Sequence, residues 1–413
     1  KKFLAIFRNK SCRAGEGTPR LLENRRVLSR AASENAQQVT ARRNPYYFKV
    51  DTEGNQLPYI DRLLVTLVES DAETRLIRML SGEIDFNSWG TSIGDFPTLK
   101  RGESAGNYRV WIGRDLWGSA AVFNINQTYD ADPVVAEYLQ NRTFRQALSL
   151  AIDREEINEV VALGQATPRQ ATFHPDTPGY QEEWGNSHAQ YDPAMANQLL
   201  DSIGLDQRNS AGWRVTPGGQ ELTLIIPVAD AIPFWIPIVE LVRDYWRQVG
   251  VRTEMRAMDT GALTQLVAAN EAQIFVWVMD NAHPVAAISR HAGFMSPDFW
   301  MGPWGVHWAT WFQSDGREGI EPPEDVKEIR QLALDLPYVS PEEQVDYLRR
   351  IAEFHAENLY MLGTIGMAGK PVLAHVDLGN VREDAIADNA DVGGNRNQWM
   401  EEFYWKSAEK RGN

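Results

Sequence analysis

The chain has 413 residues, of which 43% are apolar and 23% are charged, an ordinary balance for a globular protein with room for two or three hydrophobic cores. No apolar run approaches the length of a helix that crosses a bilayer. The net charge is −15, although the first 43 residues carry 11 of the 41 basic residues and only 3 of the 56 acidic ones. The body of the protein is therefore strongly acidic, which argues against nucleic acid as a partner.

Residues 1–40 show no sustained periodicity, and we predict a poorly structured or non-native leader there. The alternative for its basic residues is a phosphate-binding arm, although they are scattered and lack aromatic residues between them. The first apolar run, Phe3-Leu-Ala-Ile-Phe7, is too short for the core of a secretory signal. A mature exported protein would have lost its signal, so this shortness does not exclude export. The single cysteine, Cys12, lies in this leader. It excludes an intrachain disulfide and a cysteine-based metal site.

The next part of the chain, residues 41–112, is predicted to be rich in strands with one helix. Turn dipeptides at Asn44-Pro45 and Gly54-Asn55 separate aromatic and β-branched residues. A strand is expected over 63–68, a helix over 70–79 and another strand over 83–86.

A larger α/β segment follows. A short strand at 123–126 precedes a helix over 144–152, and Asp153 with Glu156 indicates the cap of a second helix that runs to 161. The pattern over 221–257 predicts a strand, an amphipathic helix and a parallel strand. A further strand is expected over 273–279.

The last third begins with residues 296–323, whose Trp, Gly and Pro content indicates an ordered loop. Helices are predicted over 323–333 and 341–358, the second with a capping box formed by Ser340 and Glu343. Residues 363–405 return to short runs typical of strands.

The order Asn44-Pro-Tyr-Tyr47, Leu57-Pro-Tyr-Ile-Asp61, a helix and then Gly82-Glu-Ile-Asp85 resembles the extracellular solute-binding proteins of family 5. These are the peptide, nickel and oligosaccharide receptors of ABC importers. The segment Phe144–Arg154 is similar to the best-marked helix pair of the family. The resemblance covers residues 41–405.

The fold that this resemblance implies is an α/β, two-lobed, periplasmic-binding-protein-like (type II) fold with a discontinuous first lobe. Residues 41–112 and 363–413 would form that lobe, residues 113–362 the second lobe, and the crossings near 113 and 363 two hinge strands. Family members usually carry a further stretch before the Asn-Pro-Tyr-Tyr motif. The resemblance therefore implies an incomplete first lobe that lacks much of its N-terminal part.

Asp280 is the first candidate ligand-binding residue, with Asn281 beside it. It follows the carboxyl end of a predicted strand, where open α/β sheets place their ligands. In peptide-binding members of the family, an acidic residue at the matching position pairs with the α-ammonium group of the peptide. The alternative is an aspartate that caps a turn through backbone N–H groups.

Tryptophans are the second group of candidates. Trp300, Trp304, Trp308 and Trp311 recur at spacings of four, four and three residues, and Gly302-Pro303 and Gly305 favour their presentation on a loop rather than one continuous helix. Indole faces suit sugar rings and peptide side chains, and at least one of these, with Trp277, is expected to face a ligand. The alternative is that they fill the core. Asn124 would offer an amide to the ligand or to the hinge.

No catalytic or metal-binding motif accompanies these residues. His283, His291 and His307 have no metal-ligand spacing, so we expect no metal and no cofactor. A glycoside hydrolase needs two carboxyl groups across a sugar site, whereas the paired glutamates here are typical of solvated faces or helix caps.

The sequence thus predicts a non-enzymatic, extracytoplasmic substrate-binding protein of an ABC importer, expected to be monomeric and to meet a membrane permease. It would bind an oligopeptide in the cleft between two lobes by hinge closure. An oligosaccharide receptor of the same family is the first alternative, a glycoside hydrolase the second, and a remnant that binds nothing the third.

Overall fold

The computed structural model describes residues 3–9, 28–31, 38–68, 72–88, 91–230, 232, 234–279, 282, 293–298, 302–386 and 398–407. The chain divides into two compact units, residues 1–115 with 369–413 and residues 116–368. The sequence predicts that the chain crosses between the two lobes near residues 113 and 363. Among the described residues, no helix is both long and apolar enough to cross a membrane.

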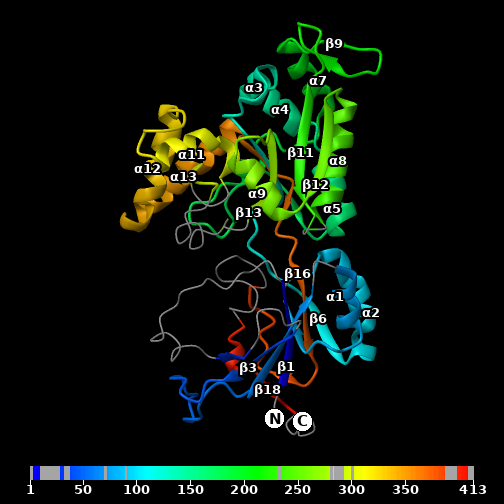
Figure 1. Ribbon diagram of the computed structural model, residues 1–413, viewed down its shortest axis with the longest axis vertical. Coiled ribbons are helices and arrows are strands. Elements are labelled where there is room, and N and C mark those ends of the chain that lie inside the picture. Colours follow the sequence, from blue (N-terminus) through cyan, green and yellow to red (C-terminus); the bar gives the residue numbers. More distant parts are fainter. Residues whose placement is uncertain are drawn as a thin grey trace. The chain divides into compact units, whose positions relative to one another are not determined.

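The first unit is built on a mixed seven-stranded sheet in the order β2-β3-β4-β1-β5-β16-β6. β1 is parallel to β4 and β5, whereas β16 is antiparallel to β5 and β6. Helices α1 and α2 pack against each other, and α2 also packs on β6 (Figure 1). The elements are β1 (Phe3–Asn9), β2 (Leu28–Ala31), β3 (Gln38–Arg43), β4 (Arg62–Val68), α1 (Ala72–Leu80), β5 (Phe86–Asn87), η2 (Ile93–Asp95), α2 (Phe96–Gly106), β6 (Tyr108–Gly113), β16 (Lys370–His375), β17 (Leu378–Gly379), η6 (Met400–Glu402) and β18 (Tyr404–Trp405).

The prediction of a poorly structured leader is wrong for Phe3–Asn9, which pairs with β4 along all seven residues. A continuous apolar run of this length is typical of a strand in the parallel part of a sheet, and it is too short to be the core of a secretory signal. The prediction of a single helix before residue 112 is also wrong. The helix α2 was missed, although Pro97 in its first turn is a common helix-start residue.

The loop between β3 and β4 is closed on itself by Asp51. Its carboxylate accepts backbone N–H bonds from Glu53 and Asn55 and a hydrogen bond of 2.6 Å from the Tyr59 hydroxyl. The Tyr59 bond is the main reason why the pKa of Asp51 falls to about 2. An ion pair of 2.8 Å joins Lys49 in this loop to Glu401 of η6. The turn residues seen in the sequence thus form a loop that is closed by Asp51 and joined to η6 of the same unit by an ion pair.

The second unit contains the predicted strand–helix–strand segment, with β11 and β12 parallel and α8 packed on both (Figure 1). The strand β7 lies between β13 and β14 and is antiparallel to both. The elements are β7 (Ser119–Ile125), α3 (Pro133–Gln140), α4 (Arg142–Leu150), α5 (Arg154–Ala162), β8 (Thr167–Pro168), α6 (Glu182–Asn186), α7 (Pro193–Ser202), β9 (Gln207–Arg208), β10 (Arg214–Val215), β11 (Thr223–Ala229), α8 (Trp235–Gln248), β12 (Arg252–Met258), α9 (Thr260–Ala268), β13 (Ile274–Met279), η3 (Pro303–Gly305), α11 (Val306–Gln313), α12 (Glu324–Asp335), η4 (Leu336–Tyr338), α13 (Pro341–Asn358), β14 (Met361–Leu362) and β15 (Ile365–Gly366).

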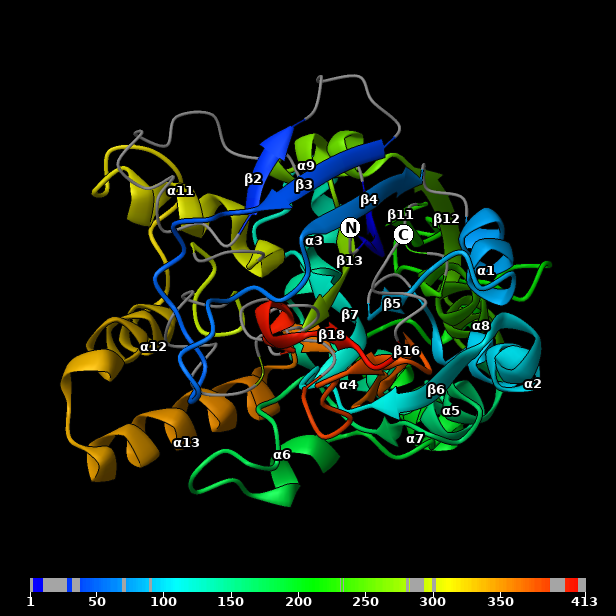
Figure 2. The same cartoon turned by 90° about the horizontal axis from the view of Figure 1, so that it is seen from below.

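Cap residues mark the start of helices in this unit, both of helices that were predicted from the sequence and of helices that were not. The capping box at Ser340 is confirmed, because Glu343 N–H donates to the Ser340 hydroxyl and the Glu343 carboxylate accepts from Ser340 N–H. Helices α3 and α7 were missed, although each begins with Asp-Pro at Asp132 and Asp192. The long helix α13 runs beside α12, and Figure 2 shows the pair from below.

Two buried arginines connect the helices α4 and α5 to the chain around β14. Arg145 Nε donates to the carbonyl of Asn358 at 2.9 Å, and Arg154 Nε donates to the carbonyl of Gly363 at 3.0 Å. Arg154 also donates to the carbonyl and the hydroxyl of Ser149. Burial lowers the pKa of Arg145 to about 10 and that of Arg154 to about 9, so both side chains remain charged at neutral pH. Each charge is therefore held inside the unit by backbone carbonyls.

We predict that Arg154→Met lowers the free energy of unfolding by about 3 kcal/mol or more, because it leaves several buried acceptors without a donor. The control is Arg142→Met, whose ion pair with Glu357 is 47% and 67% exposed and should contribute about 1 kcal/mol or less. Urea unfolding of both variants measures the difference. Equal losses in the free energy of unfolding would show that Arg154 stabilises the unit no more than the exposed ion pair of Arg142 does.

The second prediction concerns the Asp51 carboxyl group. Its folded pKa lies below its ordinary value of 3.8, so its contribution to stability is present above that value and is lost as the pH falls toward about 2. Tyr59→Phe should raise the pKa of Asp51 toward 3.8, as followed by NMR of the carboxyl carbon. Tyr46→Phe is the control, since the Tyr46 side chain is 81% exposed. An unchanged pKa in Tyr59→Phe would exclude the hydroxyl as the cause.

Candidate functional site

The candidate site starts from the pairing of β7 with β13 in the second unit. Trp277 of β13 lies opposite Val122 of β7, and the ladder shifts its register between Trp277 and Met279. Gly118 N–H then donates to the carbonyl of Met279 at 2.9 Å. Bulges of this kind redirect side chains at the end of a strand and are frequent beside functional sites.

Five aromatic side chains gather around this strand end, and we call them the aromatic platform: Trp117, Phe234, Trp235, Phe275 and Trp277. Trp277 stacks on Phe275 with ring centroids 5.5 Å apart and an angle of 13°, and it contacts Trp235 at 5.1 Å. Phe234 contacts Trp117 at 6.0 Å. The members come from three separate parts of the sequence.

The platform has a buried base and a partly exposed edge. Trp235 is fully buried, and its Nε1 donates to the carbonyl of Ala120 at 2.8 Å. Phe275 is also buried, whereas Trp277 and Phe234 are each partly exposed. Packing against the buried rings fixes the partly exposed ones, and aromatic rings held in this way are a type of group that can contact a sugar ring or a peptide side chain.

Asn124 lies on β7 beside the platform, but its amide is already used. Its Nδ2 donates to the carbonyl of Phe275 at 3.0 Å and to that of Val122 at 3.3 Å. The side chain is buried. The bond to Phe275 connects β7 to β13, which favours a structural role for the Asn124 side chain over direct contact with a ligand.

Trp304 and Trp308 lie in a different part of the unit. Trp304 is fully buried, stacks on Tyr360 at 5.3 Å and donates from Nε1 to the carbonyl of Gly293 at 2.9 Å. Trp308 is also buried and meets Trp304 edge-on at 6.2 Å. The expected loop presentation is wrong for Trp308 and Trp311, which lie on α11. The contacts of both residues favour the core alternative that the sequence left open.

The remaining predicted residues, Asp280, Asn281 and Trp300, lie outside the described residues, as do His283 and His291. His307 is described, and its Nε2 lies 3.3 Å from the Asp130 carboxylate. Within the part of the chain that the structure describes, no three His, Cys, Asp or Glu side chains gather as a metal site.

Sequence reasoning selected Trp277 but missed Trp117, Phe234 and Trp235. A weak signal was present, because Phe234-Trp235 is a pair of aromatic residues between two prolines, at the start of α8. Nothing in the sequence placed Trp117 near that pair, since their contact depends on the folded unit.

Three comparisons with known proteins bear on this arrangement. The model of the bacterial extracellular solute-binding proteins, family 5, middle region, matches residues 31–300. The periplasmic alpha-galactoside-binding protein of Rhizobium meliloti (strain 1021) is 26% identical over 271 residues, which make up 63% of this chain and 38% of that protein.

Two solved structures are also similar. The oligopeptide-binding protein OppA is 31% identical with a TM-score of 0.67, over 92% of this chain and 62% of that one. The periplasmic binding protein MelB of Agrobacterium fabrum C58, solved with stachyose, is 19% identical with a TM-score of 0.74, over 94% of this chain and 57% of that one. The present chain thus spans less than two thirds of the length of each relative.

The family model covers well over half of the chain, and the α/β elements follow the neighbouring structures. The chain therefore belongs to family 5 of the bacterial extracellular solute-binding proteins, and its fold is that of the two-lobed periplasmic binding proteins.

Proposed function

We propose that this protein is the extracytoplasmic solute-binding component of an ABC importer, and that its two compact units close on a solute by hinge motion. The observation that carries the proposal is the match to family 5, together with a partly exposed aromatic platform at the end of β13. Its partner would be a membrane permease. Binding would leave the solute chemically unchanged.

The first candidate solute is an oligopeptide. The oligopeptide-binding protein OppA is the most identical in sequence of the relatives described above, at 31%. Asp280 follows β13 directly in the sequence, and we propose that it pairs with the peptide α-ammonium group. A charge pair of this kind contributes well only when the surrounding groups also bond the carboxylate.

An oligosaccharide is the second candidate, and two observations favour it. The platform offers the flat aromatic surface on which sugar rings stack. Two relatives carry sugars in their names, an alpha-galactoside-binding protein and a structure with stachyose.

A thermal-shift experiment tests the proposal, with short peptides in one arm and stachyose in the other. A solute that binds the folded state must raise the melting temperature, in proportion to the logarithm of its concentration above Kd. A protein that shows no shift with either class would contradict solute binding. Release of monosaccharides from stachyose would indicate a glycoside hydrolase instead.

Asp280→Ala separates the two solute classes. If the solute is a peptide, this variant should lose about tenfold or more in affinity, because the proposed pair with the peptide α-ammonium group is removed. Stachyose binding should not change. Full peptide affinity in the variant would exclude Asp280 from the site.

Trp277→Ala should weaken binding of whichever solute gives the shift by about tenfold or more, as expected for an aromatic anchor. The control is Trp304→Ala, which removes a fully buried ring and should instead lower the free energy of unfolding by about 3 to 5 kcal/mol. Calorimetric titration and urea unfolding of both variants measure the two effects. Unchanged affinity in Trp277→Ala would remove the platform from the binding site.

A further inference from the structure

A histidine of the second unit lies in an apolar cage that the proposed function does not use. His355, on α13, is only 3% exposed and is surrounded by three aromatic rings. Its ring centroid lies 4.3 Å from that of Phe294, 5.0 Å from that of Phe354 and 5.4 Å from that of Trp304. We call these four residues the histidine cage.

The cage suits the neutral form of the imidazole. Both ring nitrogens of His355 are buried and form no hydrogen bond within the described part of the chain. His174 and His375 are buried to a similar extent, but each accepts a backbone N–H at Nδ1 at 3.1 Å. Protonation of His355 would add a second N–H and a positive charge, both of which are costly to bury without a polar partner.

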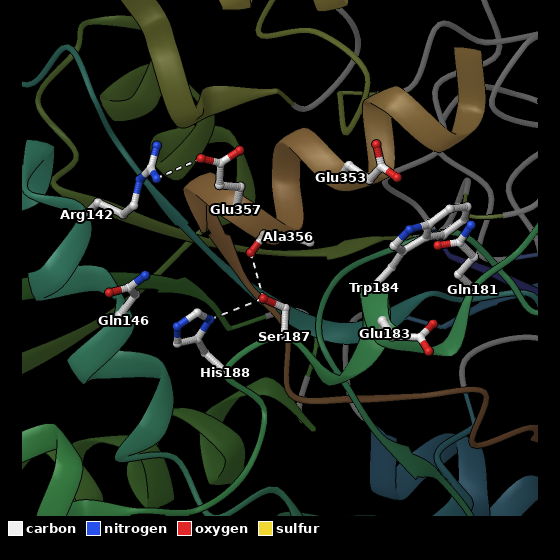
Figure 3. A pocket seen from close by; sticks show the side chains of 10 residues that line it. All are labelled: Arg142, Gln146, Gln181, Glu183, Trp184, Ser187, His188, Glu353, Ala356 and Glu357. Atoms are coloured by element: carbon white, nitrogen blue, oxygen red, sulfur yellow. Dashed lines mark hydrogen bonds and ion pairs between the residues drawn. The ribbon is translucent and has the colours of Figure 1, made fainter. Parts of the chain in front are cut away.

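The charged side chains of α13 itself face away from the cage. Glu353 and Glu357 are each two positions from His355 along the helix and therefore lie roughly 200° around its axis. Figure 3 shows both among the residues that line a groove beside α6. Glu353 is paired with Arg349 at 2.7 Å, and Glu357 is paired with Arg142 at 2.8 Å.

The charged and titratable groups on the neighbouring elements are also engaged. Asp298, which follows the Phe294 stretch, is paired with Arg330 of α12 at 3.0 Å, and Arg145 of α4 lies over the ring of Tyr360 at 4.9 Å. Burial lowers the pKa of His355 from 6.5 to about 3, and the backbone of Phe294 offsets only part of this shift. The ring is therefore neutral at pH 7.

The cover of the cage is less regular than its floor. His355 belongs to an 18-residue helix that begins with a capping box and packs on α6 and α12. Phe294 lies in an irregular stretch, and Trp304 lies in the three-residue turn η3. The Trp304 indole N–H donates to the carbonyl of Gly293, so this bond joins the two parts of the cover. Irregular segments open at a lower free energy than packed helices, which makes the cover the part that opens first.

We propose that His355 is an acid switch of the second unit, whose protonation separates Phe294 and Trp304 from α13 while the rest of the unit stays folded. Opening the cover brings the imidazole to water without breaking the helix that carries it. The released stretch follows β13 in the sequence, the strand that carries Trp277 of the aromatic platform. The switch lies within one unit and does not depend on the proposed function.

The dependence on pH has a definite sign. The folded pKa of His355 lies below the ordinary value of 6.5, so burial of the neutral ring stabilises the closed cage fully above about pH 6.5. This stabilisation is lost as the pH falls toward about 3. Because one proton is taken up on opening, the opening constant should rise about tenfold for each pH unit in that range.

Hydrogen exchange of the indole N–H groups, followed by NMR and corrected for the intrinsic effect of pH, tests the switch in the whole chain. Between pH 7 and pH 4.5, the opening constant at Trp304 should rise about hundredfold. Trp246 is the internal control, since it is also fully buried and its Nε1 donates to the carbonyl of Leu148 at 2.9 Å. At pH 4.5 the opening constant at Trp304 should exceed that at Trp246 by about tenfold or more. Equal values would mean that the whole unit unfolds, and they would overturn the proposal.

His355→Leu removes the titrating ring and keeps an apolar side chain of similar size. In this variant the opening constant at Trp304 should change by less than about threefold over the same pH range. The matched control is His307→Gln on the neighbouring helix α11, which removes a histidine that lies 3.3 Å from Asp130 and should keep the hundredfold rise. A rise that persists in His355→Leu, or its absence in the wild-type protein, would overturn the proposal. If His355→Leu does not fold, the comparison of Trp304 with Trp246 in the wild-type protein still decides.

Discussion

The second unit depends on two guanidinium groups that are buried without a carboxylate partner among the described residues. Arg145 and Arg154 bond the carbonyls of Asn358 and Gly363, which flank the short strand β14. Arg145 also lies over the ring of Tyr360 at 4.9 Å. Such charges are costly to bury unless every donor finds an acceptor, so they fix where the chain after α13 must run.

That constraint positions the elements around the candidate site. β14 pairs with β7, whose other edge pairs with β13 and carries Trp277 to the platform. After β14 the chain passes so close to residue 118 that a side chain at Gly366 would come within 2.5 Å of the Gly118 carbonyl oxygen. Met367 N–H then donates to the carbonyl of Trp117, another member of the platform. The hydrogen bonds of the two arginines and the close approach at Gly366 therefore place the last residues of the second unit beside the aromatic platform.

Local signals in the sequence were sufficient for part of this structure. Helix caps, the strand–helix–strand pattern over 221–257 and the Phe144–Arg154 motif depend on neighbouring residues, and the structure has the elements that they predict. The central place of Phe3–Asn9 and the grouping of Trp117 with Phe234 depend on contacts between distant segments. Composition also could not separate a platform tryptophan from a core one, since the partial exposure of Trp277 and the burial of Trp304 depend on what packs against each ring in the folded unit.

Small-angle X-ray scattering of the protein with and without its solute tests most directly whether the chain acts by closing on that solute. The solute is the peptide or oligosaccharide that raises the melting temperature. Our account predicts that the radius of gyration falls at saturation and returns to its starting value when the solute is removed by dialysis, with the solute recovered unchanged. A radius of gyration that stays the same at saturation, or a solute recovered as cleaved products, would contradict it.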